Sequence, residues 1–470
     1  MTAGTLNIRH RAAPGSRTRG WWPDLIGAAT VFSMLVVVAL WVHNQGLQQL
    51  VDSTTGLDSL GRLTGLASAD LLLIQVFLMA RVPPVERSFG QDRLARWHRV
   101  VGFTSFDLML AHVLLITLGY AGTDHSGVVR EFINLVLTYP GMLLALAGTV
   151  ALILVVVTSL RAARRRLRYE SWHLLHLYAY LGAGLAIPHE LWTGTDFIGD
   201  AAATAYWWTV YAVAAGSVLV FRLGLPLWRS ARYRLVVSDV VPEAPGIVSV
   251  YLRGRHLDRL RVRAGQFFHW RFLAGPGWTR AHPYSLSAAP RPDLLRITVK
   301  DLGDDSARAG ALRPGTRVLI EGPYGQLAGA GRRRPRFTMI ASGIGITPLR
   351  ALLEELPYRP GDGTLIYRAS TPDGFAFRAE LDALAARRGV RVVYLPGPRA
   401  SDGSWAPARV PGQRGSPPLG DESLLLQLVP DIAEQDVYVC GPDQWMTAAA
   451  NAARLVGVPE EHLRLEWFSW

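Results

Sequence analysis

The chain of 470 residues contains a single cysteine, Cys440, and this scarcity limits its chemistry. One cysteine can form neither an intrachain disulfide nor a cysteine-based metal site. The sequence also has no EF-hand loop, so calcium control of that kind is not implied. It has no internal repeat and no nucleic-acid-binding motif, so the net charge of +12 does not indicate a nucleic-acid partner. The length exceeds that of one ordinary domain and predicts two or three.

Half of the residues are hydrophobic, and the first half of the chain gathers them into six long runs. Each run is long enough, or nearly so, to cross the roughly 30 Å hydrocarbon core of a bilayer as a helix. The first run is too long for a signal peptide, and no small-residue cleavage site follows it. We therefore predict six membrane spans over residues 22–42, 63–80, 100–120, 136–160, 172–191 and 203–221.

Arginines predict the orientation of these spans. They gather in the N-terminal tail and in the loops after the second and fourth runs, whereas the opposite loops carry little beyond Arg62 and Arg130. The positive-inside rule then places both termini and the second half of the chain in the cytoplasm. The clustered arginines are Arg9, Arg11, Arg17, Arg19, Arg81, Arg87, Arg93, Arg96, Arg99, Arg161, Arg164, Arg165, Arg166 and Arg168.

The second half of the chain has a different pattern. From about residue 233, short alternating segments separated by turn residues predict an antiparallel β-barrel or sandwich. After the basic linker at residues 331–336, strand-like segments alternate with helix-like ones. That alternation predicts an α/β domain with a parallel sheet.

Histidines stand inside two of the apolar runs. His98 and His112 are 14 residues apart, a rotation of about 320°, so they share one helix face about 21 Å apart along the axis. In the fifth run His176 and His189 are about 19.5 Å apart, a better match than His173 and His189 at about 24 Å. Both runs leave the cytoplasm in the same direction, which pairs His98 with His176 and His112 with His189. Two stacked pairs of imidazoles suit six-coordinate haem iron.

Two features of the fifth run stay open in this interpretation. Thirteen residues turn an ideal helix by about 220°, so His176 and His189 share a face only if Gly182, Gly184 or Pro188 distorts the helix. The histidines could instead bond to other helices or line a polar cavity, although ionisable groups inside membranes are usually functional. His173 is expected to pack beside a haem edge or to bond within the bundle.

Three motifs in the barrel region suggest a flavin site. HPYSLS, residues 282–287, places an aromatic ring beside hydroxyl groups, which can stack on an isoalloxazine and hydrogen-bond its edge. VKDLGDDS, residues 299–306, offers backbone donors and a hydroxyl to a pyrophosphate, and EGPYG, residues 321–325, is a tight turn. Each motif alone could be an ordinary turn. The candidate contacts are His282, Pro283, Tyr284, Ser285, Val299, Lys300, Gly303 and Ser306.

GIGITP, residues 343–348, follows a strand and opens a helix, so it favours a phosphate at the helix N-terminus. Thr347 can cap that helix and Pro348 suits its first turn, although the last glycine of the dinucleotide fingerprint is missing. Arg368 and Ser370 end the next strand and could hold a 2′-phosphate, unless Arg368 is a surface charge. Cys440 ends a later strand beside the nicotinamide, or is simply a small buried residue. The candidate contacts are Gly343, Gly345, Thr347, Pro348, Arg368, Ser370, Cys440, Gly441 and Pro442.

The order of these parts resembles the NADPH oxidase and ferric reductase superfamily over nearly the whole chain except the N-terminal tail. The resemblance implies that His98, His112, His176 and His189 ligate two b-type haems, and the segment from Glu170 independently favours His176 over His173. It further implies that HPYS contacts FAD, that GIGITP binds the NADPH pyrophosphate, and that Cys440 lies near the nicotinamide. The aromatic residue that shields the flavin in this family maps to Phe468, with Trp470 as a competitor.

Departures from the family concern the electron acceptor. Many superoxide-forming oxidases carry a histidine one turn beyond the outer haem ligand, where this sequence has Ile116. Arg62 loosely matches their pocket arginine and is a candidate catalytic residue with Cys440 and Phe468. The external acceptor is therefore oxygen, giving superoxide or peroxide, or alternatively a ferric or other metal chelate. A rival of another class is a membrane transport or sensor protein with structural histidines, fused to a flavin reductase.

We accordingly expect a multi-pass cell-membrane protein with four parts. These are a cytoplasmic tail (1–21), a six-helix transmembrane haem domain (22–226), an FAD-binding β-barrel (227–332) and an NADPH-binding α/β domain (333–470), the last two like ferredoxin-NADP reductase. The cofactors expected are FAD, two haem b groups and NADPH. The partners expected are the lipid bilayer and a small-molecule acceptor, and an oligomer is compatible with the sequence.

Overall fold

The computed structural model describes residues 21–467 except 53, 165, 168, 199–200, 276, 326, 328–331, 402 and 410–418. The described chain divides into two compact units, one ending at Leu223 and the other beginning at Gly224. All of the expected N-terminal tail except Trp21 lies outside the described residues.

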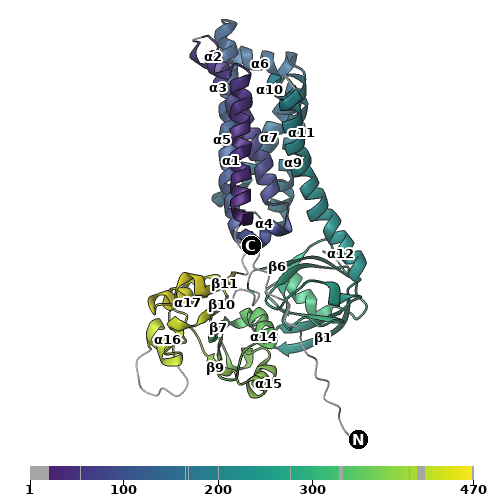
Figure 1. Ribbon diagram of the computed structural model, residues 1–470. Coiled ribbons are helices and arrows are strands. Elements are labelled where there is room, and N and C mark those ends of the chain that lie inside the picture. Colours follow the sequence, from purple (N-terminus) through teal and green to yellow (C-terminus); the bar gives the residue numbers. More distant parts are fainter. Residues whose placement is uncertain are drawn as a thin grey trace. The chain divides into compact units, whose positions relative to one another are not determined.

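Long helices lying side by side form the first unit, which we call the helical unit (Figure 1). Six of them correspond to the six apolar runs: α1, α3, α5, α7, α9 and α11. The helices are α1 (Trp21–His43), α2 (Gly46–Val51), α3 (Gly56–Leu78), α4 (Pro83–Phe89), α5 (Gln91–Thr123), α6 (Val128–Thr138), α7 (Met142–Ser159), α8 (Arg161–Arg164), α9 (Tyr169–Trp192), α10 (Thr195–Ile198) and α11 (Ala201–Ser217).

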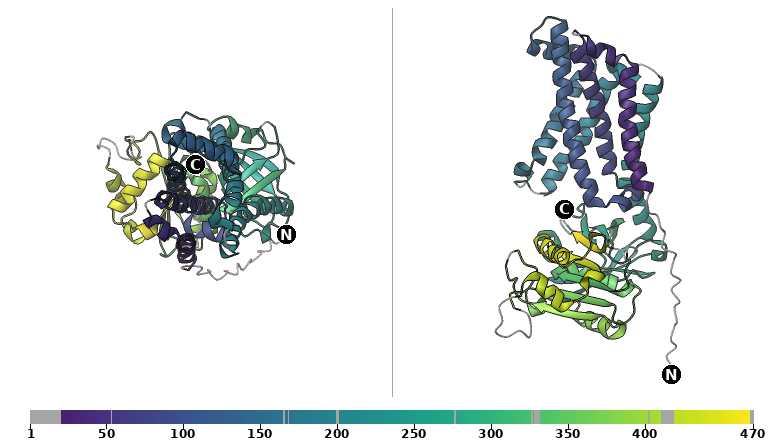
Figure 2. Two further views of the ribbon diagram at one scale, coloured as in Figure 1. Left: turned by 90° about the horizontal axis from the view of Figure 1, so that it is seen from above. Right: turned by 60° about the vertical axis from the view of Figure 1, so that its left-hand side comes forward.

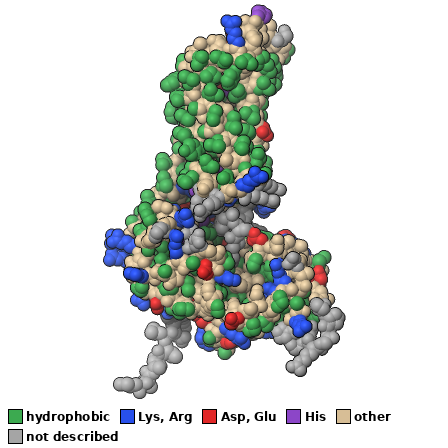
Figure 3. Space-filling view, turned by 180° about the vertical axis from the view of Figure 1, so that it is seen from behind, with side chains coloured by type: hydrophobic (Ala, Val, Ile, Leu, Met, Phe, Trp, Pro, Cys, Tyr) green, Lys and Arg blue, Asp and Glu red, His purple; other side chains and the backbone are tan. Residues whose placement is uncertain are grey.

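Among the described residues, five helical segments are long and apolar enough to cross a membrane, and hydrophobic side chains cover much of this unit's surface (Figure 3). The segments are Trp21–His43, Gly56–Leu78, Arg93–Thr123, Met142–Ser159 and Ala201–Tyr233. Helix α9 is not among them, although its 24 residues are long enough to span a bilayer. Its histidines and tyrosines lower its hydropathy, so the sixth expected span is not confirmed by composition.

Two helix pairs pack closely, α3 with α5 and α7 with α9. Glycines permit this approach between α7 and α9. A Cβ on Gly148 would lie 2.7 Å from the carbonyl oxygen of Gly182, and a Cβ on Gly182 would lie 3.0 Å from that of Gly148. Small residues at such crossings are typical of membrane helices, because the backbones can then approach each other.

A buried carboxylate joins three of the helices. Asp70 on α3 is fully buried and accepts hydrogen bonds from Ser33 on α1 (2.7 Å) and from Tyr206 on α11 (3.0 Å). Ser33 and Tyr206 are themselves 2.8 Å apart. The cluster therefore ties α1 and α11 to α3 by polar contacts inside an otherwise apolar bundle.

The second unit, which we call the reductase unit, begins with a π-helical segment η1 (Val218–Gly224) that crosses the unit boundary and with α12 (Leu225–Tyr233). Its antiparallel region contains two three-stranded sheets, ordered β1-β2-β5 and β4-β3-β6. The strands are β1 (Val236–Ala244), β2 (Ile247–Arg253), β3 (Phe267–Phe272), β4 (His282–Ser285), β5 (Leu294–Lys300) and β6 (Val318–Tyr324).

The antiparallel pairing agrees with the sequence, but closure into a barrel is not confirmed. Within the described part of this region, the two sheets are joined by isolated bridges, Val236 with Arg317 and Leu286 with Ile297. Between the sheets lies a core that includes the fully buried side chains of Phe268 and Trp270. Short elements η2 (Leu257–Arg259), α13 (Asp304–Ala307) and η3 (Arg308–Ala311) connect the strands.

The parallel region has the predicted α/β architecture. One five-stranded parallel sheet runs in the order β11-β10-β7-β8-β9. Helices α14 and α15 pack with one set of alternating strand residues, and α16 and α17 pack with the other, so both faces are covered (Figure 2). The elements are β7 (Phe337–Ser342), η5 (Gly343–Gly345), α14 (Ile346–Glu355), β8 (Gly363–Ala369), η6 (Pro372–Gly374), α15 (Arg378–Arg388), β9 (Arg391–Pro396), α16 (Asp421–Leu428), η7 (Ile432–Glu434), β10 (Asp436–Gly441), α17 (Asp443–Leu455), η8 (Glu460–His462) and β11 (Leu463–Trp467).

The Asp70 cluster yields a stability prediction. Asp70→Ala should destabilise the helical unit by about 1–2 kcal/mol, since interhelical hydrogen bonds in membrane proteins contribute about 1 kcal/mol each. Thermal unfolding of the full chain in detergent measures the change. Asp70→Asn keeps an acceptor oxygen and should lose less, and Asp124→Ala, at an exposed site, is the matched control. Equal midpoints for Asp70→Ala and Asp124→Ala would contradict the assignment.

Candidate functional site

Two of the four histidines singled out in the sequence face each other between α5 and α9. The ring centres of His98 and His176 are 6.0 Å apart, with an interplanar angle of 63°. His98 Nδ1 lies 3.1 Å from the carbonyl oxygen of Gln75, and His176 Nδ1 lies 3.4 Å from Ser159 Oγ. His173 lies beside Trp172 rather than in this pair.

The other two histidines form a second pair. His112 on α5 places Nδ1 2.8 Å from the carbonyl oxygen of Gly61, and His189 on α9 places Nδ1 2.6 Å from that of Ala186. The two imidazoles are near enough to interact electrostatically. The structure thus brings His98 to His176 and His112 to His189, as the helical spacing predicts.

The carbonyl partners select a tautomer. A carbonyl oxygen can only accept, so the proton of His98, His112 and His189 resides on Nδ1, and the hydroxyl of Ser159 can stabilise the same state in His176. That leaves Nε2 of each ring with its lone pair. Metal-ligating histidines usually have this arrangement, with the second nitrogen bonded to a carbonyl that fixes the ring.

Glycines that the sequence pattern did not single out make room for the second pair. A Cβ on Gly65 would lie 2.6 Å from His112 Nδ1, so a larger residue on α3 would displace the ring. Gly141, at φ +82, lies so close to α9 that a Cβ would be 2.7 Å from the backbone nitrogen of His189. The signal for the first was present in the sequence, because Gly61 and Gly65 form a G-x-x-x-G pair.

Helix α9 contains all three residues expected to adjust the phase of its histidines. Pro188 lies inside the helix and has no N–H for the carbonyl of Gly184, which is a usual origin of bending. Gly182 contacts α7, whereas a Cβ on Gly184 would meet nothing within 4 Å. Pro188 is therefore the residue whose chemistry accounts best for a local distortion before His189.

Arg62 is held by an ion pair at its end of the helical unit. Its Nε donates to Asp196 Oδ2 at 2.7 Å and its Nη2 to Asp196 Oδ1 at 2.6 Å. A further hydrogen bond joins Arg62 to Gln49, and Asn44 donates to the same Asp196. Asp196 thus neutralises the charge of the Arg62 guanidinium. To bind an anion, Arg62 would have to divide its hydrogen bonds between Asp196 and that anion.

The first flavin motif lies on an antiparallel strand of the reductase unit. HPYS forms strand β4, where the rings of His282 and Tyr284 stack at 6.0 Å and 20°. Ser285 is buried, and Pro283 pairs with His269 on β3. A half-buried pair of stacked rings beside a hydroxyl provides the kind of surface that the isoalloxazine edge requires.

The expected pyrophosphate loop is closed on itself. Val299 is buried in β5 and Lys300 ends that strand exposed. Gly303, at φ +140, donates its N–H to Asp301, and Ser306 Oγ accepts from Leu302 N at 2.7 Å. A pyrophosphate here would have to replace these internal hydrogen bonds.

The glycine loop at residues 343–345 lies against strand β10. A Cβ on Gly345 would come within 2.2 Å of the carbonyl oxygen of Cys440, so only glycine fits. The carbonyl of Gly343, at φ +53, accepts from Tyr367, a contact absent from the sequence reasoning. The cap position of α14 is Gly345, because the 3-10 turn advances the helix start.

The expected role of Thr347 as a cap is therefore wrong. Its hydroxyl instead donates to the carbonyl of Ile344 at 3.0 Å, and Pro348 is buried within the first turn. Both residues still lie at the N-terminus of a helix that follows strand β7 and packs on the parallel sheet, the position where backbone N–H groups attract phosphate.

Cys440 is a buried thiol at the carboxyl end of β10. Its Sγ lies 3.5 Å from the carbonyl oxygen of Glu466 on β11, and burial and the charge of Glu466 raise the pKa of the thiol well above its usual value. The surroundings therefore favour the neutral thiol over the reactive thiolate. Gly441 packs on Trp445, and Pro442 is the cap of α17.

Arg368, the last residue but one of β8, is almost completely buried. Its Nη2 donates to the carbonyl of Gly397 at 3.0 Å, while its Nε is buried without a partner among the described residues. Burial and the neighbouring charge of Arg399 lower the pKa of Arg368. Ser370 is exposed two residues further on. Two arginines close together at the carboxyl edge of the sheet provide a potential anion site.

Phe468 and Trp470 lie outside the described residues, so which of them covers a flavin stays a prediction. Glu466, two residues before Phe468, is 9 % exposed. A Cβ on Gly325 would lie 3.0 Å from its carboxylate. The last strand therefore reaches the EGPYG turn of the antiparallel region.

Two family models match this chain. Residues 64–187 match the ferric reductase like transmembrane component, and residues 339–451 match the oxidoreductase NAD-binding domain. The chain joins a ferric-reductase-like membrane component to an oxidoreductase domain. This pairing confirms the resemblance to the ferric reductase and NADPH oxidase superfamily.

Curated relatives match about half of the chain. A ferredoxin reductase component of 3-ketosteroid-9-alpha-monooxygenase from Mycolicibacterium smegmatis is 30% identical over 249 residues, covering 50% of this chain and 65% of the relative. A flavohemoprotein from a Burkholderia species is 29% identical over 250 residues, covering 51% and 60%. The chain thus spans less than two thirds of either relative.

Among solved structures, the flavohem-like FAD/NAD-binding domain of a nitric oxide dioxygenase from Vibrio cholerae is also similar. It is 21% identical, with a TM-score of 0.39, and the match covers 50% of this chain and 97% of that one.

The close approach of Gly345 to Cys440 yields a prediction. Gly345→Ala should weaken nucleotide binding roughly tenfold or more, because the loop that opens α14 must move away from β10. Fluorescence titration of the full-length protein with NADP⁺ measures the affinity. Gly403→Ala is the matched control, since a Cβ there meets nothing within 4 Å. An unchanged affinity in Gly345→Ala would show that the close contact does not shape the site.

Proposed function

We propose that the protein moves electrons from cytoplasmic NADPH through FAD and two b-type haems to an acceptor on the outer side of the cell membrane. The observation that carries this proposal is the pairing of four histidines between α5 and α9 in a chain that also has an oxidoreductase NAD-binding domain. Bound haem would supply one-electron transfer, which imidazole pairs support without an open coordination site.

The histidine pairs fit haem iron on two counts. Two metal–imidazole bonds of about 2 Å each, together with the distance from each nitrogen to its ring centre, add up to roughly 6 Å. The ring centres of His98 and His176 are 6.0 Å apart. Carbonyl partners on Nδ1 also leave Nε2 free to ligate. His98 and His176 would hold one haem, and His112 and His189 the other.

The orientation follows from the arginines. One end of the helical unit carries the arginine-rich connections around α4 and α8, and the other carries Arg62, which Asp196 neutralises. The positive-inside rule assigns the first end, and with it the reductase unit, to the cytoplasm. NADPH and FAD would then be supplied from the cytoplasm, and His112 and His189 would lie nearer the outer surface.

The flavin would be held by the antiparallel region and the nucleotide by the parallel region. Stacked His282 and Tyr284, with the buried Ser285, suit the isoalloxazine. The α14 N-terminus suits a pyrophosphate. Arg368, with Arg399 beside it, suits a 2′-phosphate better than a ribose hydroxyl, because its buried guanidinium gains an anionic partner.

Oxygen, giving superoxide or peroxide, is the first candidate acceptor, and a ferric chelate is the second. One contact favours the second. Ile116 stands where many superoxide-forming oxidases have a histidine, and its side chain packs against Gly61 of α3. Arg62 is already paired with Asp196, and residue 116 is an apolar isoleucine. Neither position therefore supplies a positive charge that would stabilise superoxide.

The haem assignment predicts a spectroscopic outcome. His112→Ala and His189→Ala should each abolish the reduced b-type absorbance of one haem, since each removes an iron ligand. The same variants in membrane vesicles should lose NADPH-driven reduction of a ferric chelate and of a superoxide-sensitive dye on the outer side. His125→Ala, at an exposed site, is the control. A full haem spectrum in both variants would leave the histidines structural, as in a transport or sensor protein.

The anion site predicts a preference for NADPH over NADH. Arg368→Ala should lower kcat/KM for NADPH by roughly tenfold or more and change that for NADH little, because charge-assisted bonds to a phosphate are lost. Reduction of a soluble dye by the purified protein measures both. Arg391→Ala, at an exposed arginine one strand away, serves as the control. A wild-type protein that uses both nucleotides equally would contradict the assignment.

A further inference from the structure

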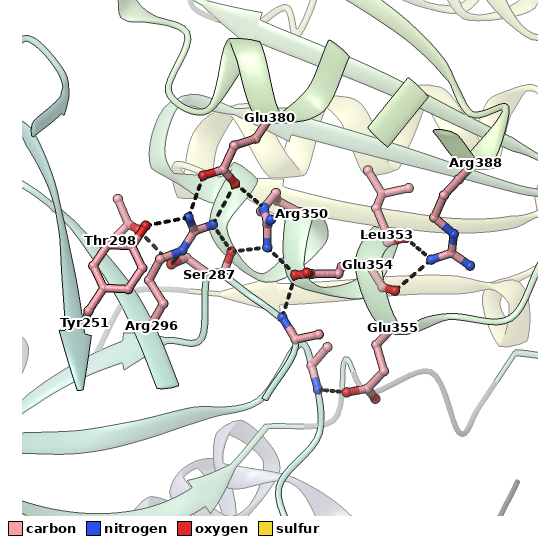
Figure 4. Close-up of polar contacts among 12 residues, drawn as sticks. Tyr251, Ser287, Arg296, Thr298, Arg350, Leu353, Glu354, Glu355, Glu380 and Arg388 are labelled. Carbon is pink, nitrogen blue, oxygen red and sulfur yellow. Dashed lines mark hydrogen bonds and ion pairs between the residues drawn. The ribbon is translucent and has the colours of Figure 1, made fainter. Parts of the chain in front are cut away.

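A buried arginine joins the flavin-motif strand to the helices of the parallel region. Arg296 on β5 donates to both carboxylate oxygens of Glu380 on α15, at 2.7 and 3.0 Å (Figure 4). It also donates to the carbonyl and the hydroxyl of Ser287, two residues beyond the HPYS strand, at 2.8 and 3.1 Å. Its guanidinium lies 4.8 Å from the ring centre of Phe377.

A second buried arginine repeats this connection from the neighbouring helix. Arg350 on α14 donates to the same carbonyl of Ser287 at 3.1 Å and pairs with Glu354. Its Nε forms an ion pair with Glu380 Oε2 at 2.8 Å, at an angle unlike that of a hydrogen bond. Figure 4 shows both guanidinium groups converging on Glu380 and Ser287.

Further contacts complete the junction. Glu354 accepts from the backbone nitrogen of Ala289 and Glu355 from that of Ala264, so α14 is bonded to two loops of the antiparallel region. Thr298 donates to Ser287 Oγ at 2.7 Å. Burial alone would favour the neutral form of Glu380, but the hydrogen bonds from Arg296 and the charge of Arg350 outweigh it and lower its pKa. The two arginines therefore favour the charged form of Glu380.

We propose that Arg296, Arg350 and Glu380 are positioning residues that fix the nicotinamide site against the flavin site for hydride transfer. The proposal rests on the proposed function. The step oxidises NADPH to NADP⁺ and delivers one proton and two electrons to the flavin. Its rate depends on the distance between donor and acceptor, and a misplacement of about 1 Å can cost roughly 100-fold.

The geometry explains why these residues have that effect. Ser287 lies two residues after the strand whose HPYS residues would face the flavin, and Arg350 lies in the first turns of the helix whose N-terminus would face the phosphates. A side chain that bonds both elements fixes their separation. Arg296 is 4% exposed, and parting the regions would separate it from Glu380, its charged partner across the junction. The regions should therefore move as one body.

The test is anaerobic stopped-flow reduction of the flavin in the full-length protein in detergent, at saturating NADPH. Glu380→Gln keeps the shape and removes the charge that both arginines share. We expect the hydride-transfer rate to fall at least tenfold, while the dissociation constant for NADP⁺ stays within twofold. Glu460→Gln is the matched control, because it disrupts an exposed pair with Arg454 and should leave the rate unchanged.

A second variant covers the case in which Glu380→Gln fails to retain FAD. Arg350→Lys keeps the charge but loses the planar fork that reaches Ser287, Glu354 and Glu380 together, and it should slow the same step with flavin bound. Wild-type rates in either folded variant would overturn the positioning role. If NADPH does not reduce the flavin of the wild-type protein, the proposed function itself is overturned, so the two failures are distinguishable.

Discussion

An imidazole inside a lipid-facing bundle must have its polar nitrogens satisfied, and this constraint organises the helical unit. Backbone carbonyls near His98, His112 and His189 accept from Nδ1, which is possible only where a helix leaves a carbonyl open or a neighbouring helix comes very close. Two of these carbonyls belong to α3. The close α3–α5 packing is thus a condition for orienting the histidines of α5, rather than a separate feature of the bundle.

The sequence predicts this unit well because its signals are periodic and local. Six apolar runs become six long helices, and a 14-residue spacing places His98 and His112 on one face. The hydrogen-bond acceptors were not predictable in the same way, because every residue carries a backbone carbonyl. Gly61, Gly65 and Gly141 leave space for close packing near the outer histidines, and this space is what marks their surroundings. A glycine in a sequence can serve several purposes, so it does not by itself predict such a site.

The reductase unit was less predictable where contacts are long-range. Alternation of strands and helices gave the five-stranded parallel sheet, and HPYS and GIGITP fall where a strand and a helix start were expected. The sequence did not predict that Cys440 would lie against Gly345, or that Glu466 would reach Gly325. The closure of the antiparallel strands also depends on pairings between distant segments, and single bridges replace continuous ladders there.

The two units fix their sites by different means, and the difference follows from their surroundings. In the helical unit the partners of the histidines are mostly neutral carbonyls, since an unpaired charge in hydrocarbon is costly. In the reductase unit Arg296 and Arg350 can be buried because Glu380 and Glu354 supply opposite charge at the junction. A backbone carbonyl can accept a hydrogen bond from an imidazole whatever the side chain of its residue is. The arginine junction, in contrast, depends on four particular side chains. A single substitution at Glu380 can therefore alter the alignment of the nucleotide and flavin sites, while the histidine pairs are sensitive chiefly to the glycines that admit them.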